Sequence, residues 1–217
     1  MLRLILPLDR RESLRLLCLG AHADDIEIGC GGTILRIAAE IPGLIVRWIV
    51  FSGDERRRAE AQNSAAALLE NVSEKQIEVL EFRDGYFPSQ GANIKDYFEA
   101  VKRDFDPSFI LTHCQNDAHQ DHRLLAELTF NTFRNHLMLE YEIPKYDGDL
   151  GNPNFFVPLT RAQLQRKIDT ISHHFVSQQG RSWFTEETFV AMARLRGIGC
   201  NAPEGVAEAF YVRKIVF

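Results

Sequence analysis

The chain has 217 residues, a length that suits one domain, or one domain with a modest appendage, and that gives room for a sizeable buried core. Lys and Arg number 25 against 30 Asp and Glu, so the net charge is -5, and the basic residues are scattered apart from the short run at 56–58. This weakly acidic balance argues against nucleic acid as a partner.

The N-terminal run MLRLILPLDRR contains an apolar stretch that is too short for a signal peptide, and charged residues follow it instead of small ones. No later segment approaches the roughly 20 apolar residues of a membrane span. The four cysteines lie far apart without CxxC spacing, which argues against a disulfide framework and against a cysteine zinc site. We therefore expect reduced thiols, no membrane span and a cytoplasmic protein.

Short apolar runs alternate with segments of helical periodicity through the first 140 residues. This alternation predicts strands at 14–20, 44–51, 76–82 and 108–112, and helices at 33–41, 55–69, 94–104 and 121–133. A βαβα series of this kind indicates an α/β fold. We expect a Rossmann-like three-layer sandwich in which helices cover both faces of a mostly parallel sheet.

A stretch rich in Gly, Asn, Asp and Pro at 144–158 predicts a break in the chain. Beyond it the pattern predicts helices at 161–175 and 186–195 and a closing strand at 209–216. These elements suggest a small α+β extension attached to the core. We expect a single catalytic domain over 1–217, with a core at about 12–143 and an extension at about 155–217.

Unusual polar sequences follow two of the predicted strands. The first strand runs into AHADDIE at 21–27, and the fourth runs into HCQNDAHQDHR at 113–123. In open α/β sheets, ligands bind beyond the carboxyl ends of the strands. We therefore expect both segments to face one crevice.

The residue types in these segments suit a catalytic metal, which takes three nitrogen or oxygen ligands and keeps one position open for water. His22 and Asp25, three residues apart in a tight turn, can supply two ligands, and His119 or His122 the third. The alternative is that such residues only cap the following helices. Two clusters at two strand ends favour metal binding, with Zn²⁺ as the expected ion and Fe²⁺ or another divalent metal as alternatives.

Asp24 and Asp25 are adjacent carboxylates, and two unneutralised charges side by side in a crevice repel each other and raise one pKa. A cation resolves this conflict. One carboxylate then binds the metal, and the other is free to accept a proton from the attacking water. The alternative role for Asp24 is a helix N-cap.

The segment AHADDIEIGCGGT at 21–33 resembles the AHPDDE-type signature of the PIG-L/LmbE-like N-deacetylase family. HQDH at 119–122 resembles the second motif of that family, HPDH or HxDH. Weaker similarity extends over most of the chain, through RRAE at 57–60, DG at 84–85, SQ at 177–178, RG at 196–197 and AEAF at 207–210. Ala23 stands where the family usually has Pro, which removes stiffness from the turn but no reacting atom.

The resemblance implies a metal site and a base. His22, Asp25 and His122 would be the metal ligands. Asp24 would be the general base that takes a proton from the attacking water.

The resemblance also implies four further roles. A positively charged His119 would stabilise the tetrahedral oxyanion and protonate the leaving amine. Asp121 would orient a motif histidine through its ring N–H. Arg57 and Asp84 fall where the family contacts its substrate.

These roles together imply a zinc-dependent N-deacetylase. Its substrate would be a small-molecule sugar or glycoconjugate, such as an N-acetylglucosamine derivative or a glycoconjugate precursor. A homo-oligomer is compatible with the sequence.

Several alternatives stay open on the sequence. His113 ends a predicted strand and could lie beside the metal ligands. The run at 56–58 could be a solvated helix face, although its position aims one member at the crevice. Gly29–Gly32 predicts a close helix–sheet contact, because it is neither GxGxxG nor a Walker sequence.

Two rival functions also stay open. Two histidines and a carboxylate are the ligand set of non-haem iron oxygenases as well. The other rival is a binding protein that keeps the fold without turnover. The α/β pattern, together with Asp24, His119 and Asp121, favours hydrolysis over both.

Overall fold

The computed structural model describes residues 13–215, so the N-terminal run considered above and position 216 of the expected closing strand lie outside the described residues. Within 13–215, seven strands form one sheet in the order β3-β2-β1-β4-β5-β7-β6. The strands are β1 (Arg15–His22), β2 (Ile45–Ser52), β3 (Glu74–Val79), β4 (Phe109–His113), β5 (Leu137–Tyr141), β6 (Phe155–Pro158) and β7 (Ala207–Val212). The helices are α1 (Asp25–Glu40), α2 (Glu55–Leu68), α3 (Gly91–Asp104), α4 (Gln120–Thr132), α5 (Arg161–His174) and α6 (Glu186–Cys200), with short 3-10 turns η1 (Phe87–Gln90) and η2 (Val176–Gln178).

The first five strands along the chain are parallel, and at one edge β7 runs antiparallel both to β5 and to its other neighbour, β6. The predicted α/β fold with a mostly parallel sheet is therefore confirmed. Strand order reverses at β1, which pairs with β2 on one side and with β4 on the other. This reversal opens the crevice in which ligands of such sheets bind.

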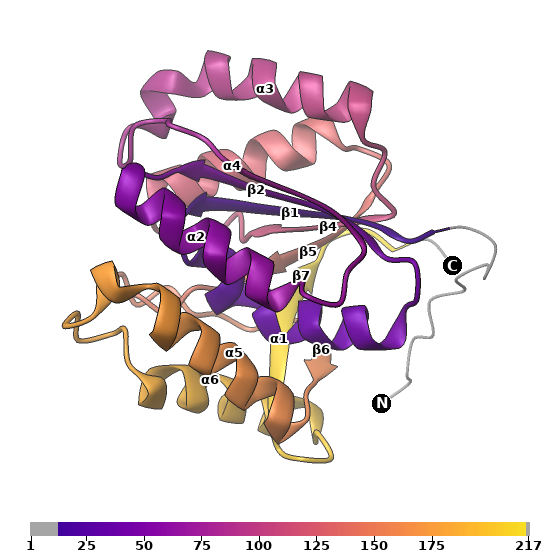
Figure 1. The fold of residues 1–217 in the computed structure, drawn as a ribbon, viewed down its shortest axis with the longest axis vertical. Coiled ribbons are helices and arrows are strands. Elements are labelled where there is room, and N and C mark those ends of the chain that lie inside the picture. Colours follow the sequence, from indigo (N-terminus) through magenta and orange to yellow (C-terminus); the bar gives the residue numbers. More distant parts are fainter. Residues whose placement is uncertain (1–12, 216–217) are drawn as a thin grey trace.

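Helices cover both faces of the sheet, with α3 and α4 on one face and α1, α2, α5 and α6 on the other (Figure 1). Side chains along β1 alternate between the two resulting cores. Leu16 and Cys18 belong to the core beneath α1 and α5, whereas Leu17 and Leu19 belong to the core beneath α3 and α4. Burial on both faces explains why β1 reads as a continuous apolar run.

The C-terminal elements complete the same sheet through β5, a strand that the sequence pattern did not predict. β7 pairs with β5, and β6 pairs with β7. β5 is only five residues long and contains Glu140, which hides the apolar pattern. The Glu140 carboxylate is buried, and Arg213 compensates its charge by donating a hydrogen bond to it over 2.7 Å.

Helix α1 begins at Asp25, eight residues before the predicted start, and runs through the glycine-rich segment. Glycine disfavours helices, so sequence propensity places the start too late. Packing overrides this preference. A Cβ on Gly29 would lie 2.2 Å from the Tyr141 ring, and one on Gly32 would lie 2.4 Å from Leu159. The predicted close helix–sheet contact is confirmed.

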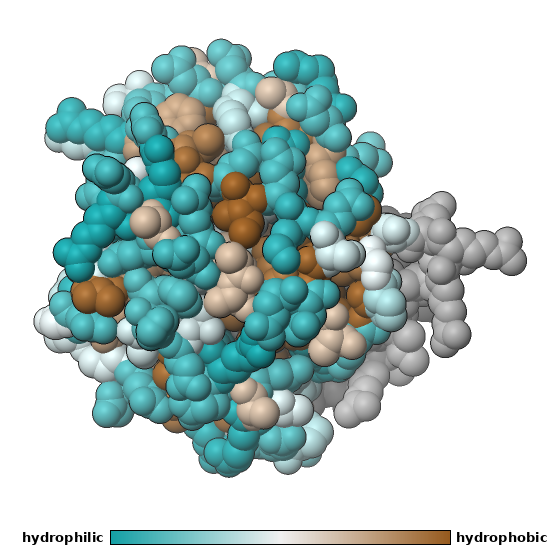
Figure 2. Space-filling view, viewed as in Figure 1, coloured by the Kyte–Doolittle hydropathy of each residue, from teal (hydrophilic) through white to brown (hydrophobic). Residues whose placement is uncertain are grey.

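Hydrophilic residues predominate on the face shown in Figure 2, where the apolar patches are small and separated. None of the helices in 13–215 combines the length and the apolar character that crossing a membrane requires. All four cysteines lie within this part of the chain and are free thiols, three of them buried.

Candidate metal centre and active site

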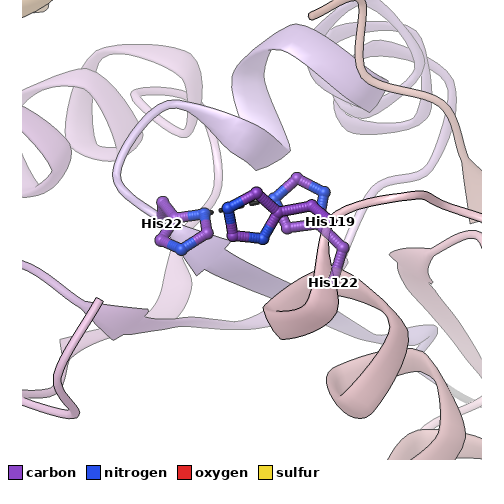
Figure 3. A group of neighbouring side chains, drawn as sticks. All are labelled: His22, His119 and His122. Carbon is purple, nitrogen blue, oxygen red and sulfur yellow. Dashed lines mark hydrogen bonds between the residues drawn. The ribbon is translucent and has the colours of Figure 1, made fainter. Parts of the chain in front are cut away.

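Three imidazoles gather at the carboxyl ends of β1 and β4 (Figure 3). His22 is the last residue of β1, and Asp25 is the first residue of α1. His119 occupies the N-cap position of α4, and His122 lies in the first turn of that helix. The two polar segments predicted to share a crevice therefore meet at the reversal of strand order.

Three donor atoms in this cluster have the mutual spacing of metal ligands. His22 Nδ1 lies 3.1 Å from His122 Nε2, and Asp25 Oδ2 lies 3.4 Å from the former atom and 3.5 Å from the latter. Ligands at 2.0–2.2 Å around a tetrahedral Zn²⁺ are roughly 3.3–3.6 Å apart. All three residues are buried. The set therefore fits a divalent cation.

Carboxylates behind the two rings favour the tautomers that metal binding needs. His122 Nδ1 lies 2.9 Å from Asp117 Oδ2, and His22 Nε2 lies 3.2 Å from Asp121 Oδ2. When each of these nitrogens donates to its carboxylate, the opposite nitrogen presents its lone pair to the cluster. Hydrogen bonds of this kind fix the orientation of metal-binding histidines and raise their basicity.

Other donors nearby form overlapping groups, one of them His22, His119 and His122, and several of these donors also accept hydrogen bonds. His113 Nε2 lies 3.2 Å from Asp25 Oδ2, yet it accepts the Ala21 N–H over 2.9 Å. Asp121 lies near His22, but its two oxygens accept the backbone N–H groups of Gly85 and Phe87 at 2.6 and 3.0 Å. The cluster therefore contains several overlapping sets of donors that could hold a cation.

Asp24 has an unusual backbone and a perturbed pKa. Its φ of 104° lies in the left-handed region, and although it occupies the N-cap position of α1, its side chain makes no capping hydrogen bond. The alternative role as a capping side chain therefore has no geometric support. Burial raises the pKa of Asp24 to about 7, against the lowering effect of Arg57. A carboxyl group with a pKa near neutrality suits a general base.

His119 is half-buried at the rim of the cluster, and its ring centroid lies 4.6 Å from that of His122. Its Nδ1 accepts the Asp121 N–H over 3.3 Å, so the proton of the neutral ring resides on Nε2. Burial and the neighbouring His22 lower the pKa of His119. This shift disfavours the positively charged form, so the residue suits an N–H donor better than a permanent cation.

Arg57 braces the turn that follows β1. It lies in the first turn of α2, where Asp54 accepts its backbone N–H, and it donates to the Ala23 carbonyl over 2.6 Å. The guanidinium also lies 3.5 Å from Asp24 and 3.6 Å from Asp84. This contact holds a turn that lacks the stiffness of proline. Of the run at 56–58, Arg57 is the member that contacts Asp24 and Asp84.

Asp84 marks the entrance to the cluster, because its side chain is 55% exposed while it lies 3.1 Å from His22 Nε2. That hydrogen bond lowers the pKa of Asp84 to about 2. A cleft of about 400 Å³ adjoins it, lined by residues 52–55, Arg57, Arg58 and 81–84. The cleft has the size of a small-molecule site, and charged residues make up most of its lining.

The structure brings all eight predicted site residues into one contact network. It also adds residues for which the sequence pattern predicted no role. Asp117 contacts His122, and Lys145 contacts Asp117 over 3.0 Å. His113, left open on the sequence, is fully buried and stacks on His122 with ring centroids 3.9 Å apart. Proximity to the second motif was the available signal for Asp117, but no local signal pointed to Lys145.

Glu27 is completely buried in α1, and burial raises its pKa to about 8. In an unfolded chain the pKa is about 4.3. The native state therefore holds this proton more tightly. The resulting stabilisation is fully present below about pH 4.3 and is lost as the pH rises to about 8.

We expect Glu27→Gln to flatten the pH dependence of stability in metal-free protein. Between about pH 5 and 8 the wild-type free energy of unfolding should fall by up to roughly 1.4 kcal/mol per pH unit more than that of the variant. Urea denaturation at several pH values measures both slopes. Equal slopes would show that Glu27 ionises at little cost in the folded protein.

Fold and site together define an α/β protein with a His/Asp cluster of metal-binding geometry at the carboxyl edge of a parallel sheet. The sequence profile of the PIG-L family, described as GlcNAc-PI de-N-acetylase, matches residues 17–133. The match spans more than half of the chain, and the chain belongs to this family. No curated protein matches the sequence.

Solved structures share the fold over nearly the whole chain. The conserved protein TT1542 from Thermus thermophilus is 22% identical, with a TM-score of 0.72 and coverage of 94% of this chain and 96% of that one. N,N'-diacetylchitobiose deacetylase from Pyrococcus horikoshii is 19% identical, with a TM-score of 0.67 and coverage of 96% and 87%. GalB, the 4-carboxy-2-hydroxymuconate hydratase from Pseudomonas putida, is 18% identical, with a TM-score of 0.74 and coverage of 94% and 98%. At these identities the likeness shows the fold alone.

Proposed function

We propose that the protein is a zinc-dependent hydrolase that removes an N-acyl group, acetyl in the first instance, from a sugar-derived small molecule. The observation that carries the proposal is the triad of His22 Nδ1, Asp25 Oδ2 and His122 Nε2, spaced 3.1–3.5 Å apart. Membership of a family described as a de-N-acetylase supplies the reaction class. The deacetylase among the structural neighbours supports the same assignment.

His22, Asp25 and His122 would hold the cation, which when bound polarises the acyl carbonyl and lowers the pKa of a water molecule. Asp24 takes the proton of the attacking water, because its carboxyl is buried beside the triad and has a pKa near neutrality. The neutral His119 ring donates a hydrogen bond from Nε2 to the developing oxyanion, and the proton that Asp24 took from the water passes to the leaving amine, which restores the Asp24 carboxylate. The chain thus offers a group for each proton transfer of amide hydrolysis.

The acceptor part of the substrate would occupy the polar cleft beside Arg57 and Asp84. Its lining offers guanidinium donors and carboxylate acceptors, which suit a hydroxyl-rich ligand. A sugar bearing an N-acetyl group matches this chemistry. Apolar ligands would leave these charged groups without partners.

The fold does not select the reaction by itself, since a hydratase shares it. An oxygenase would use a similar ligand set. Amide hydrolysis is favoured over both because Asp24 and His119 flank the triad as a base and an N–H donor.

The proposal predicts stoichiometric release of acetate and free amine from an N-acetyl sugar. Zn²⁺-loaded protein would be incubated with N-acetylglucosamine, N,N'-diacetylchitobiose and a glycoconjugate bearing N-acetylglucosamine, with His122→Ala as the matched control. Acetate and primary amine, assayed separately, should appear in equal amounts with wild type only. Metal-loaded wild type that releases neither product from any member of a broad N-acyl sugar panel would contradict the proposal.

A further inference from the structure

Behind His122, on the side away from the cluster, the segment 144–151 contacts the loop that precedes α4. Lys145 Nζ lies 3.0 Å from Asp117 Oδ1 and 2.6 Å from Asp149 Oδ2. Asp149 Oδ2 also accepts the Ala118 N–H over 2.6 Å. The side chains of Lys145, Asp117 and Asp149 are only 9%, 3% and 12% exposed. Two loops distant in sequence are therefore joined by a shielded network of charges.

The donors around Asp117 divide its two oxygens between different partners. Oδ1 accepts from the His119 N–H over 2.8 Å and from Lys145. Oδ2 is left to accept from His122 Nδ1 over 2.9 Å. Because both donors lie on the Oδ1 side, they fix the rotation of the carboxylate and direct Oδ2 at the histidine ring.

We propose that Lys145 is a positioning residue that acts through Asp117 to fix the tautomer and orientation of His122. The ring then carries its proton on Nδ1 and presents the Nε2 lone pair to His22 and Asp25. Stacking against His113 holds the plane of the ring, but it does not choose which nitrogen is protonated. The expected consequence, tighter metal binding, rests on the proposed function. The tautomer of His122 can be measured without metal.

Asp117→Asn should reverse the tautomer of His122. The Lys145 ammonium and the His119 N–H are both donors, so the amide oxygen of the variant must face them. Its NH₂ group then faces His122 Nδ1, which has to accept. The proton moves to Nε2 and blocks the nitrogen that points at the cluster.

Long-range ¹H–¹⁵N spectra of the histidine rings at neutral pH test the inference in metal-free protein. Wild type should show the Nδ1–H tautomer at His122, Asp117→Asn the Nε2–H tautomer, and Lys145→Met a mixture of the two. Lys95→Met is the matched control, because Lys95 also joins a carboxylate, Glu99, but lies on α3 away from the cluster. It should leave the His122 spectrum unchanged.

Competition with a chromophoric chelator measures the affinity for Zn²⁺ in the same variants. Lys145→Met should weaken binding about 10-fold and Asp117→Asn up to about 100-fold, with Lys95→Met like wild type. A wild-type His122 spectrum in both Lys145→Met and Asp117→Asn would overturn the inference. If wild type binds no Zn²⁺, the proposed function fails, while the ring spectra still decide the role of Lys145.

Discussion

His22→Ala and His122→Ala should each abolish stoichiometric metal binding and, with it, deacetylation. Each substitution removes one of three donor atoms that lie 3.1–3.5 Å apart. Losing a partner that merely orients a metal ligand costs about 10–100-fold in affinity, so losing a ligand should cost more than about 100-fold. Elemental analysis of purified protein should give about one divalent metal per chain for wild type and close to none for either variant.

His136→Ala provides the control for that experiment. His136 is a histidine paired with a carboxylate, Asp106, over 2.8 Å, but it lies outside the cluster. The variant should keep the metal content of wild type. Circular dichroism of all three variants separates loss of metal from loss of fold. Full metal retention in both His22→Ala and His122→Ala would remove the proposed site.

Elements with a purely local signal could be predicted from the sequence. β1 and β2 are buried on both faces and read as apolar runs, and α2 and α4 show helical periodicity. β5 could not be predicted in the same way, because the charge of Glu140 is neutralised by Arg213 from beyond the far end of β7. The early start of α1 likewise depends on Tyr141 and Leu159, which approach its glycines only in the folded chain.

Some residues of the candidate site could likewise be predicted from the sequence, and others could not. His22, Asp25 and His122 belong to short motifs at strand ends, where the rule for open sheets already places ligands. The role of Lys145 could not be predicted, since it depends on the path of the loop 144–151 back to Asp117. The lowered pKa of His119 was also hidden, because it arises from burial and from His22 across the crevice.

A substitution at Asp24 can test the catalytic step separately from metal binding, and Asn is the informative replacement. The φ of 104° strains most side chains, whereas Asn tolerates the left-handed region almost as well as Asp. Ala would add backbone strain to the loss of the carboxylate. Asp24→Asn should therefore keep the fold and the metal, so any loss of rate belongs to the missing base.

Thr160→Ala is the reference variant for the alternative role of Asp24, in which its side chain is only a helix N-cap. Thr160 caps α5 through a reciprocal pair of hydrogen bonds with Gln163, away from the cluster. Its loss should cost about 1 kcal/mol of stability and leave kcat unchanged. If Asp24 were only a cap, Asp24→Asn would change neither stability nor turnover appreciably, because Asn caps helices as well as Asp does.

We expect Asp24→Asn to lower kcat by about 10²-fold or more with KM nearly unchanged, because the base acts only as the transition state is approached. The pH profile gives the sign of the effect. Only the deprotonated carboxylate accepts a proton, so wild-type activity should be lost as the pH falls through the pKa of Asp24. That pKa is about 7 without metal, and a neighbouring cation shifts it lower. Asp24→Asn should lack this acidic limb, and a fully active variant with confirmed metal content would mean that another group activates the water.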